Sequence, residues 1–119
     1  MANYQALMTG VEVTVLPAGT TAVSTASTPV AVPANMPYLR LGILGVGTIS
    51  TGKLQWEESS DPAYSGTWSA VGSEITIVAG QTYTRPTVGV YQFLRARVTT
   101  GVTGAGGSIS ATILGAVAR

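Results

Sequence analysis

Apolar and polar residues alternate along several short stretches of the chain with a period of two. Leu39, Leu41 and Ile43 fall on one side of an extended segment, and the residues between them fall on the other. This period is that of a β-strand with one buried face, and no helical period holds over a comparable length. The same alternation predicts further strands around residues 11–15, 30–32, 54–57, 68–70, 75–78, 93–98 and 109–113.

Glycine, proline, serine and aspartate separate these stretches, and each of them favours a turn. About seven to nine short strands joined by turns are typical of a sandwich or a small barrel, because only packing or closure buries one side of so many strands. We therefore expect one all-β domain, an antiparallel β-sandwich of jelly-roll or Ig-like type. It would span residues 10–119 and follow a flexible N-terminal arm at residues 1–9.

Prolines set the expected limits of the weaker strands. Pro17 and Gly19 should end the first strand, because proline lacks the N–H that a strand ladder needs. Residues 20–28 could form a loop or a weak edge strand, and their β-branched side chains slightly favour the strand. Pro86 indicates that residues 83–88 form a corner between sheets or a long surface connection.

Residues 53–71 predict a hairpin that contains both tryptophans of the chain. Trp56 and Trp68 share their strand faces with apolar neighbours, so we expect both rings to lie in the core and to join the two sheets. The turn between the strands would then expose Asp61 and Tyr64 to a partner. The alternative is that the aromatic rings of the chain line a platform for sugars.

The composition excludes several kinds of chemistry. The chain has no cysteine and no histidine, so it has no disulfide, no thiolate and no imidazole to bind a metal or transfer a proton. We therefore expect no enzymatic activity and no cofactor. Charged residues make up only 9% of the chain, and a surface so poor in charge is prone to associate. Much of the surface should be covered in the working state.

The charges and the hydropathy pattern also limit the partners. The six lysines and arginines are scattered and form no patch, so we do not expect a nucleic-acid partner. No stretch approaches the length of a membrane span, and the N-terminus lacks the basic start and apolar run of a signal peptide. We expect no membrane partner and a product that stays where it is made until it assembles or is released.

One acidic cluster contains Glu57, Glu58 and Asp61. Carboxylates of this kind can hold calcium or act as the paired acids of a glycosidase. The spacing matches no calcium-binding loop. We therefore expect Glu57 to face side chains of neighbouring strands and Asp61 to cap a turn.

Three arginines fall on the outward faces of predicted strands, at Arg40, Arg95 and Arg97, and Glu57 has the same outward position in its own strand. If these strands are neighbours, the four residues form a charge ladder across one sheet. Each cross-strand pair would contribute about 0.2–1 kcal/mol. The alternative is that the arginines dock an acidic partner.

Two segments of the chain resemble small β-sandwich structural proteins of tailed bacteriophages. The first is LQWEESSDPAYSGTWSAVG, which begins at Leu54, and the second is YQFLRARVTTGVTGAGGSISATI, which begins at Tyr91. The shared pattern is a Leu-Gln strand, a Ser/Asp turn and a Thr-Trp strand, and later a Phe-Leu-Arg-Ala-Arg-Val strand with a Gly-rich turn into a Ser/Ile strand. Domains of this kind occur as head decoration proteins, head fibres and tail or baseplate modules.

For a free-standing chain of this size, the resemblance implies a capsid decoration (cement) protein. Its partner would be the major capsid protein, which it would bind as a homotrimer on the virion exterior after synthesis in the host cytoplasm. A terminal arm would clasp the shell through Asn3, Tyr4, Gln5, Leu7 and Met8. The alternative is a tail, baseplate or head-fibre module that binds glycans on the host surface.

Overall fold

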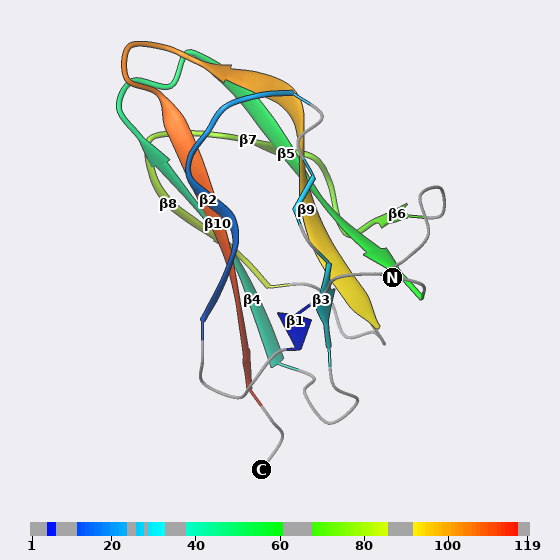
Figure 1. Cartoon of the computed structure of the whole chain (residues 1–119). Helices are drawn as coiled ribbons and strands as arrows, with labels where there is room; N and C mark the ends of the chain where they lie inside the picture. Colours follow the sequence, from blue (N-terminus) through cyan, green and yellow to red (C-terminus); the bar gives the residue numbers. More distant parts are fainter. Residues whose placement is uncertain are drawn as a thin grey trace.

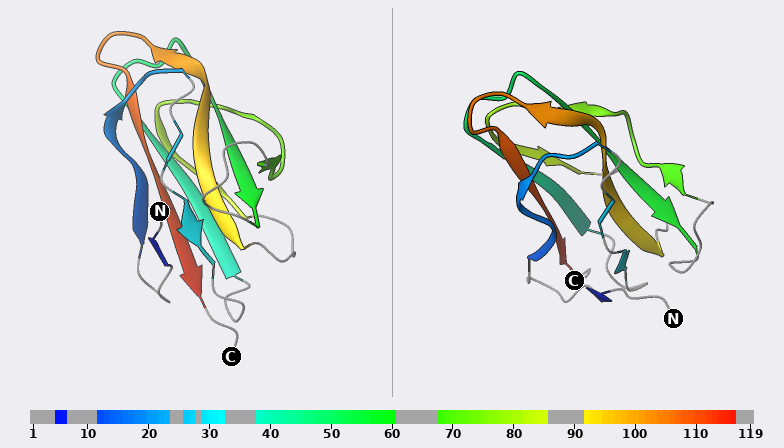
Figure 2. Two further views of the ribbon diagram at one scale, coloured as in Figure 1. Left: turned by 45° about the vertical axis from the view of Figure 1, so that its right-hand side comes forward. Right: turned by 45° about the horizontal axis from the view of Figure 1, so that its top comes forward.

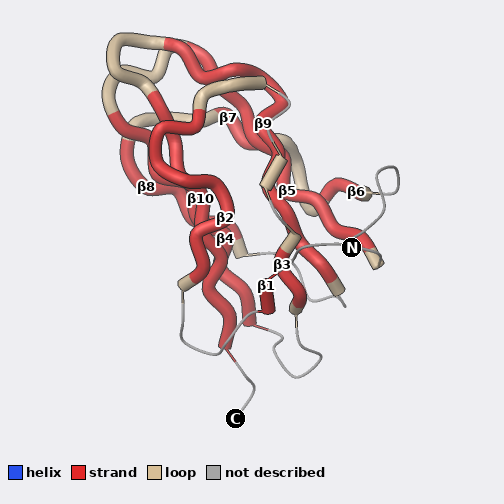
Figure 3. Tube along the Cα trace, viewed as in Figure 1, coloured by secondary structure: helices blue, strands red, loops and turns tan. Residues whose placement is uncertain are grey.

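The described residues form two β-sheets that pack face to face (Figures 1 and 3). The computed structural model describes residues 5–6, 12–23, 26–27, 29–32, 38–60, 68–85 and 92–116. These residues contain strands, turns and connections, and none of them is helical. The structure confirms the predicted all-β sandwich in a single domain.

The first sheet, sheet A, has the strand order β1-β3-β9-β5-β6, and β7 also pairs with β5. Its long strands are β9 (Phe93–Thr103) and β5 (Thr51–Ser59). The short strands are β1 (Gln5–Ala6), β3 (Val30–Ala31), β6 (Ser69–Ala70) and β7 (Ile75–Thr76). The β1–β3 pair is parallel, and the other pairs are antiparallel.

The second sheet, sheet B, is wholly antiparallel. Its strands follow the order β2 (Val13–Thr20), β10 (Ser108–Ala116), β4 (Tyr38–Val46) and β8 (Gly80–Thr84). The strands β2 and β8 are therefore its two edges. Figure 2 shows the long strands of the two sheets facing each other across the domain.

The core lies between the sheets and is built from the predicted inner positions of the long strands. These are Leu39, Leu41 and Ile43 in β4, Leu54 and Trp56 in β5, Leu94, Ala96 and Val98 in β9, and Ile109, Ala111 and Ile113 in β10. Complete burial of a large apolar side chain contributes about 1.5–3 kcal/mol, so these inner faces provide the main force that holds the sheets together.

Strand β2 runs further than the sequence predicts. It continues through Pro17 to Thr20, whereas the proline was expected to end it. An edge strand tolerates proline, because only one of its sides has to supply N–H groups to a ladder. The register with β10 shifts on both sides of Leu16, so Val15 and Leu16 are both buried although they are neighbours in sequence.

The segment after β2 lies along β9 through separate contacts. The Val102 N–H donates to the Thr21 carbonyl at 2.8 Å. Ser27 is buried, its N–H donates to the Ala96 carbonyl at 2.8 Å, and its Oγ accepts from the Ala96 N–H at 2.8 Å. Together with β3, these residues cover the side of β9 that β5 leaves open.

Two residues of the predicted N-terminal arm belong to sheet A. Gln5 and Ala6 form β1, which pairs with β3, so the arm contains a short paired segment at these positions. A two-residue strand has no alternation of its own, and its pairing depends on the edge that β3 offers. The other arm residues with a predicted role, Asn3, Tyr4, Leu7 and Met8, lie outside the described residues.

Two loops meet at one end of the sandwich, the loop between β4 and β5 and the loop between β9 and β10 (Figure 1). The Thr48 N–H donates to the Ala105 carbonyl at 3.0 Å, and the Ser50 N–H donates to the Thr103 carbonyl at 2.8 Å. Gly104 has a φ of +123°, and a Cβ at this position would collide with the Thr48 carbonyl oxygen. Position 104 therefore requires glycine both for its φ and for the close approach of the two loops.

Candidate interaction surfaces

The outer face of sheet A carries a group of side chains that we call the Glu57 cluster, formed by Glu57, Arg95, Arg97 and Trp68. The register of β5 with β9 places Glu57 opposite Arg95. Arg95 Nε donates to Glu57 Oε1 at 2.9 Å, and Arg97 Nε donates to Glu57 Oε2 at 3.2 Å. The Glu57 side chain is only 9% exposed, so its carboxylate is largely shielded from water, while the two arginines keep part of their hydration. Charge-assisted bonds of this kind are stronger than neutral ones.

Trp68 belongs to this outer cluster, and the prediction that it joins the two sheets in the core is wrong. The guanidinium of Arg95 lies 4.3 Å from the centroid of the Trp68 ring, a cation–π contact. The hairpin register explains the difference. The Val71 N–H donates to the Trp56 carbonyl at 2.8 Å, and Val71 is the residue that turns into the core beside Trp56. Trp68 has the opposite parity and faces outward.

Gln55 fixes this register, a role that the sequence did not indicate. Its Nε2 donates to the Val71 carbonyl at 3.4 Å and to the Gly72 carbonyl at 3.2 Å. It also donates to the Trp56 carbonyl at 2.9 Å. The amide thus ties β5 to the returning chain after β6. Outward polar residues of a strand are common, so alternation alone carries no signal for this contact.

Arg40 does not belong to the charge ladder, because it lies on β4 in sheet B. Its Nη2 lies 3.4 Å from Glu12 Oε2, and its guanidinium lies 4.3 Å from the centroid of the Tyr83 ring. The alternation placed Arg40 correctly on an outward face. It could not tell which of the two sheets that face belongs to, because strand order is a long-range property.

The outer face of sheet B exposes large apolar side chains, and we call it the apolar face. Tyr38 is 63% exposed, Leu44 38%, Val46 44% and Tyr83 51%. The first three point to the same side of β4, where Arg40 and Gly42 lie between Tyr38 and Leu44. Tyr83 lies on the neighbouring strand β8. Arg40 and Glu12 neutralise each other's charge on this face. Exposed apolar side chains that share one face of a sheet indicate a contact site more often than isolated ones do.

Gly42 makes the middle of the apolar face flat. It pairs with Tyr83 on one side and with Thr112 on the other. A Cβ at Gly42 would lie 3.2 Å from the Tyr83 ring and 3.0 Å from the Thr112 hydroxyl, so the side chains of both neighbours lean over the glycine. The Tyr83 ring therefore lies beside Gly42, with the Arg40 guanidinium over it, and the residue keeps about half of its surface exposed.

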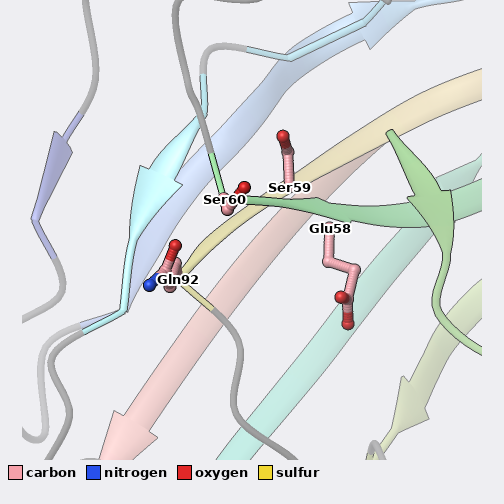
Figure 4. A pocket seen from close by; sticks show the side chains of 4 residues that line it. All are labelled: Glu58, Ser59, Ser60 and Gln92. Atoms are coloured by element: carbon pink, nitrogen blue, oxygen red, sulfur yellow. The ribbon is translucent and has the colours of Figure 1, made fainter. Parts of the chain in front are cut away.

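The two acidic-cluster residues that the structure describes, Glu57 and Glu58, point to opposite sides of β5. Figure 4 shows the Glu58 and Ser59 side chains leaving β5 in opposite directions, as neighbours in a strand do. Glu57 accordingly faces the arginines, while Glu58 lines a pocket of about 190 Å³ with Ser59, Ser60 and Gln92. Among the described residues, this lining offers one carboxylate, whereas a glycosidase site needs two. Within the described residues, no three potential ligands among His, Cys, Asp and Glu gather to hold a metal ion.

Comparisons with known proteins do not assign the chain to a family. No family model matches the chain, and no curated protein or solved structure matches it either. In the described part of the chain, no helix is long and apolar enough to cross a membrane. The predicted contact residues of the hairpin turn, Asp61 and Tyr64, lie outside the described residues.

The apolar face could have been predicted from the sequence, although the strand pattern was used only to place the core. The alternation from Tyr38 to Ile43 continues to Val46, so Leu44 and Val46 occupy outward positions of the same strand. Apolar side chains at outward positions are the sequence mark of a face that contacts something. The same reasoning applies to Tyr83, which β8 presents outward.

Proposed function

We propose that this chain is a non-enzymatic virion structural protein that decorates a capsid and stabilises it by binding the lattice of the major capsid protein. The observation that supports this most directly is the apolar face, with four large apolar side chains on one side of sheet B. The low charge of the chain and the resemblance of residues 53–113 to phage β-sandwich proteins support the same proposal.

The apolar face is the better candidate for the capsid contact than the Glu57 cluster. Arg95 and Arg97 already hold Glu57 between them, so their charges are engaged within the sheet. On the apolar face, covering a large apolar side chain completely contributes about 1.5–3 kcal/mol, and partly covered side chains contribute less. The matching surface of the partner should be apolar and nearly neutral, because Arg40 and Glu12 compensate each other.

A decoration protein can bind a capsid tightly through several linked copies. A single face of this size binds modestly, but linked copies that engage a lattice together bind about 10²–10⁴ times more tightly than one copy alone. The protein would therefore act as a homo-oligomer, with the trimer favoured, on the exterior of capsids assembled in the host cytoplasm. Many modest contacts spread over neighbouring subunits would then resist rupture of the shell.

Co-sedimentation with empty capsids tests this proposal. The wild-type protein should sediment with the capsids, and the double variant Leu44→Ser/Val46→Thr should bind at least about tenfold less, because it removes apolar area from the face. Val23→Thr is the matched control, since Val23 is another exposed valine and lies outside this face. Wild-type protein that stays in the supernatant would refute the capsid contact.

A glycan-binding tail, baseplate or head-fibre module is the second candidate. It is favoured by the exposed rings of Tyr38 and Tyr83, since sugars stack on aromatic faces. Glycan binding that is lost in Tyr38→Ala, in a protein that still folds and does not bind capsids, would select this function over decoration.

A further inference from the structure

Strand β8 leaves one side of sheet B open. It forms the last position of the strand order, and β4 is its hydrogen-bonded neighbour in the part of the chain that the structure describes. Successive backbone groups of a strand point to opposite sides, so about half of the N–H and C=O groups of β8 point away from β4. These groups form a template on which another strand can pair.

The other edge of sheet B is built differently. Strand β2 contains Pro17, and its register with β10 shifts at two places. Proline and irregular register both hinder the addition of a further strand. Strand β8 has the sequence GQTYT, which contains no proline and no charge and includes three residues that favour β-structure. Within the described residues, sheet B is thus protected at β2 and open at β8.

We propose that β8 pairs antiparallel with β8 of a second copy of this chain, about a two-fold axis at Thr82. The sequence of β8 fits this partner. In this register Thr82 faces its own counterpart, and Gln81 of each copy faces Tyr83 of the other. Gly80 faces Thr84. Because β8 contains no charged residue, this register brings no like charges together within the strand pair. Arg85, which follows β8 directly in the sequence, falls opposite the uncharged Ala79.

The second copy extends the apolar face as well as the backbone ladder. Sheet B of one copy continues into sheet B of the other, so both apolar faces lie on the same side of the joined sheet. Gln81 and Tyr83 are exposed side chains, and each would be covered in part by its cross-strand partner. The contact is isologous, so it closes with two copies and leaves other surfaces available for a three-fold contact. The proposed β8–β8 pairing is argued from the open strand edge and does not depend on the proposed capsid binding.

Charge reversal across the two-fold axis tests the pairing. Gln81→Lys/Tyr83→Lys places like charges opposite each other, whereas Gln81→Glu/Tyr83→Lys places opposite charges there. Both variants lose the same Tyr83 ring and its contact with Arg40, so they are matched controls for folding. We expect the first to weaken self-association at least about tenfold in sedimentation equilibrium, and the second to restore it to within about threefold of wild type.

A single cysteine provides a second test that does not depend on these variants. The chain has no cysteine, so Thr82→Cys introduces one thiol per copy. The proposed axis places the two thiols opposite each other, at a Cα separation of about 4.5–5.5 Å that a disulfide can bridge. Oxidation with oxidised glutathione should give a disulfide dimer. The control Thr76→Cys lies in sheet A at an exposed position and should give far less.

The mass of the wild-type oligomer in solution is the decisive measurement for this proposal. We expect a dimer of the 12.1 kDa chain, or a hexamer where the trimer of the proposed function also forms, because the two-fold contact then joins two trimers. Amide exchange at residues 80–84 should slow as the concentration rises toward about 1 mM. A monomer or a simple trimer without such protection would overturn the pairing, as would equal behaviour of the two double variants or equal cross-linking of the two cysteine variants. None of these results bears on co-sedimentation of the protein with capsids, so the two proposals fail separately.

Discussion

The replacement of Glu57 by glutamine measures how much the Glu57 cluster stabilises sheet A. Glutamine keeps the shape of the side chain and removes the charge that Arg95 and Arg97 share. Glutamine has one acceptor oxygen, so one of the two bonds persists as a neutral bond and weakens by about 1 kcal/mol. At the other position an amide NH2 faces an arginine N–H, so that bond, worth about 1.5–3 kcal/mol, is lost. The Arg95 and Arg97 side chains are 21% and 36% exposed and remain partly hydrated, which limits the loss. We expect the free energy of unfolding to fall by about 2–3 kcal/mol.

Urea unfolding at neutral pH is the assay, and Glu74→Gln is the matched control. Glu74 pairs with Lys53 at 3.7 Å, and both side chains are largely exposed, so its replacement should change the free energy of unfolding by less than about 0.5 kcal/mol. In the Glu57→Gln background, Arg97→Gln should recover part of the loss, because it removes one of two unpaired cations. Equal effects of Glu57→Gln and Glu74→Gln would refute the reasoning.

Two further pairs of variants test the packing. Trp56→Ala should lower the free energy of unfolding by about 3–5 kcal/mol, and Trp68→Ala by only about 1 kcal/mol, because the first ring is buried in the core and the second lies on Arg95 at the outer face. Urea unfolding measures both, and similar losses would contradict the placement of Trp68. Gly104→Ala should lower the melting temperature more than Gly106→Ala. Both glycines have a positive φ, but only at Gly104 would a Cβ meet backbone. A calorimetric scan that ranks them in the reverse order would show that the two loops do not pack as described.

The inner faces of the long strands could be predicted from the sequence, because burial imposes a period of two on each strand separately. Leu94, Ala96 and Val98 show this clearly, since all three are fully buried. The position of Arg40 could not be predicted in the same way. Its outward direction follows from its neighbours, but its place in sheet B depends on which strands pair across the fold.

Trp68 shows a second limit of local pattern. Its parity relative to Trp56 depends on how the chain returns after the turn, and that register depends on contacts such as those of Gln55 with the Val71 and Gly72 carbonyls. The continuation of β2 through Pro17 shows a third. Proline is compatible with an edge strand, and the sequence does not state which strands lie at the edge.

The measurement that tests the proposed function most directly is hydroxyl-radical footprinting of the protein on empty capsids. Tyr38 and Leu44 lie on the apolar face, and Trp68 on the opposite outer face serves as an internal reference. We predict that Tyr38 and Leu44 lose most of their reactivity on binding, while that of Trp68 stays close to its value in the free protein. Capsid-bound protein in which Tyr38 and Leu44 remain as reactive as in solution would contradict the assignment of the apolar face.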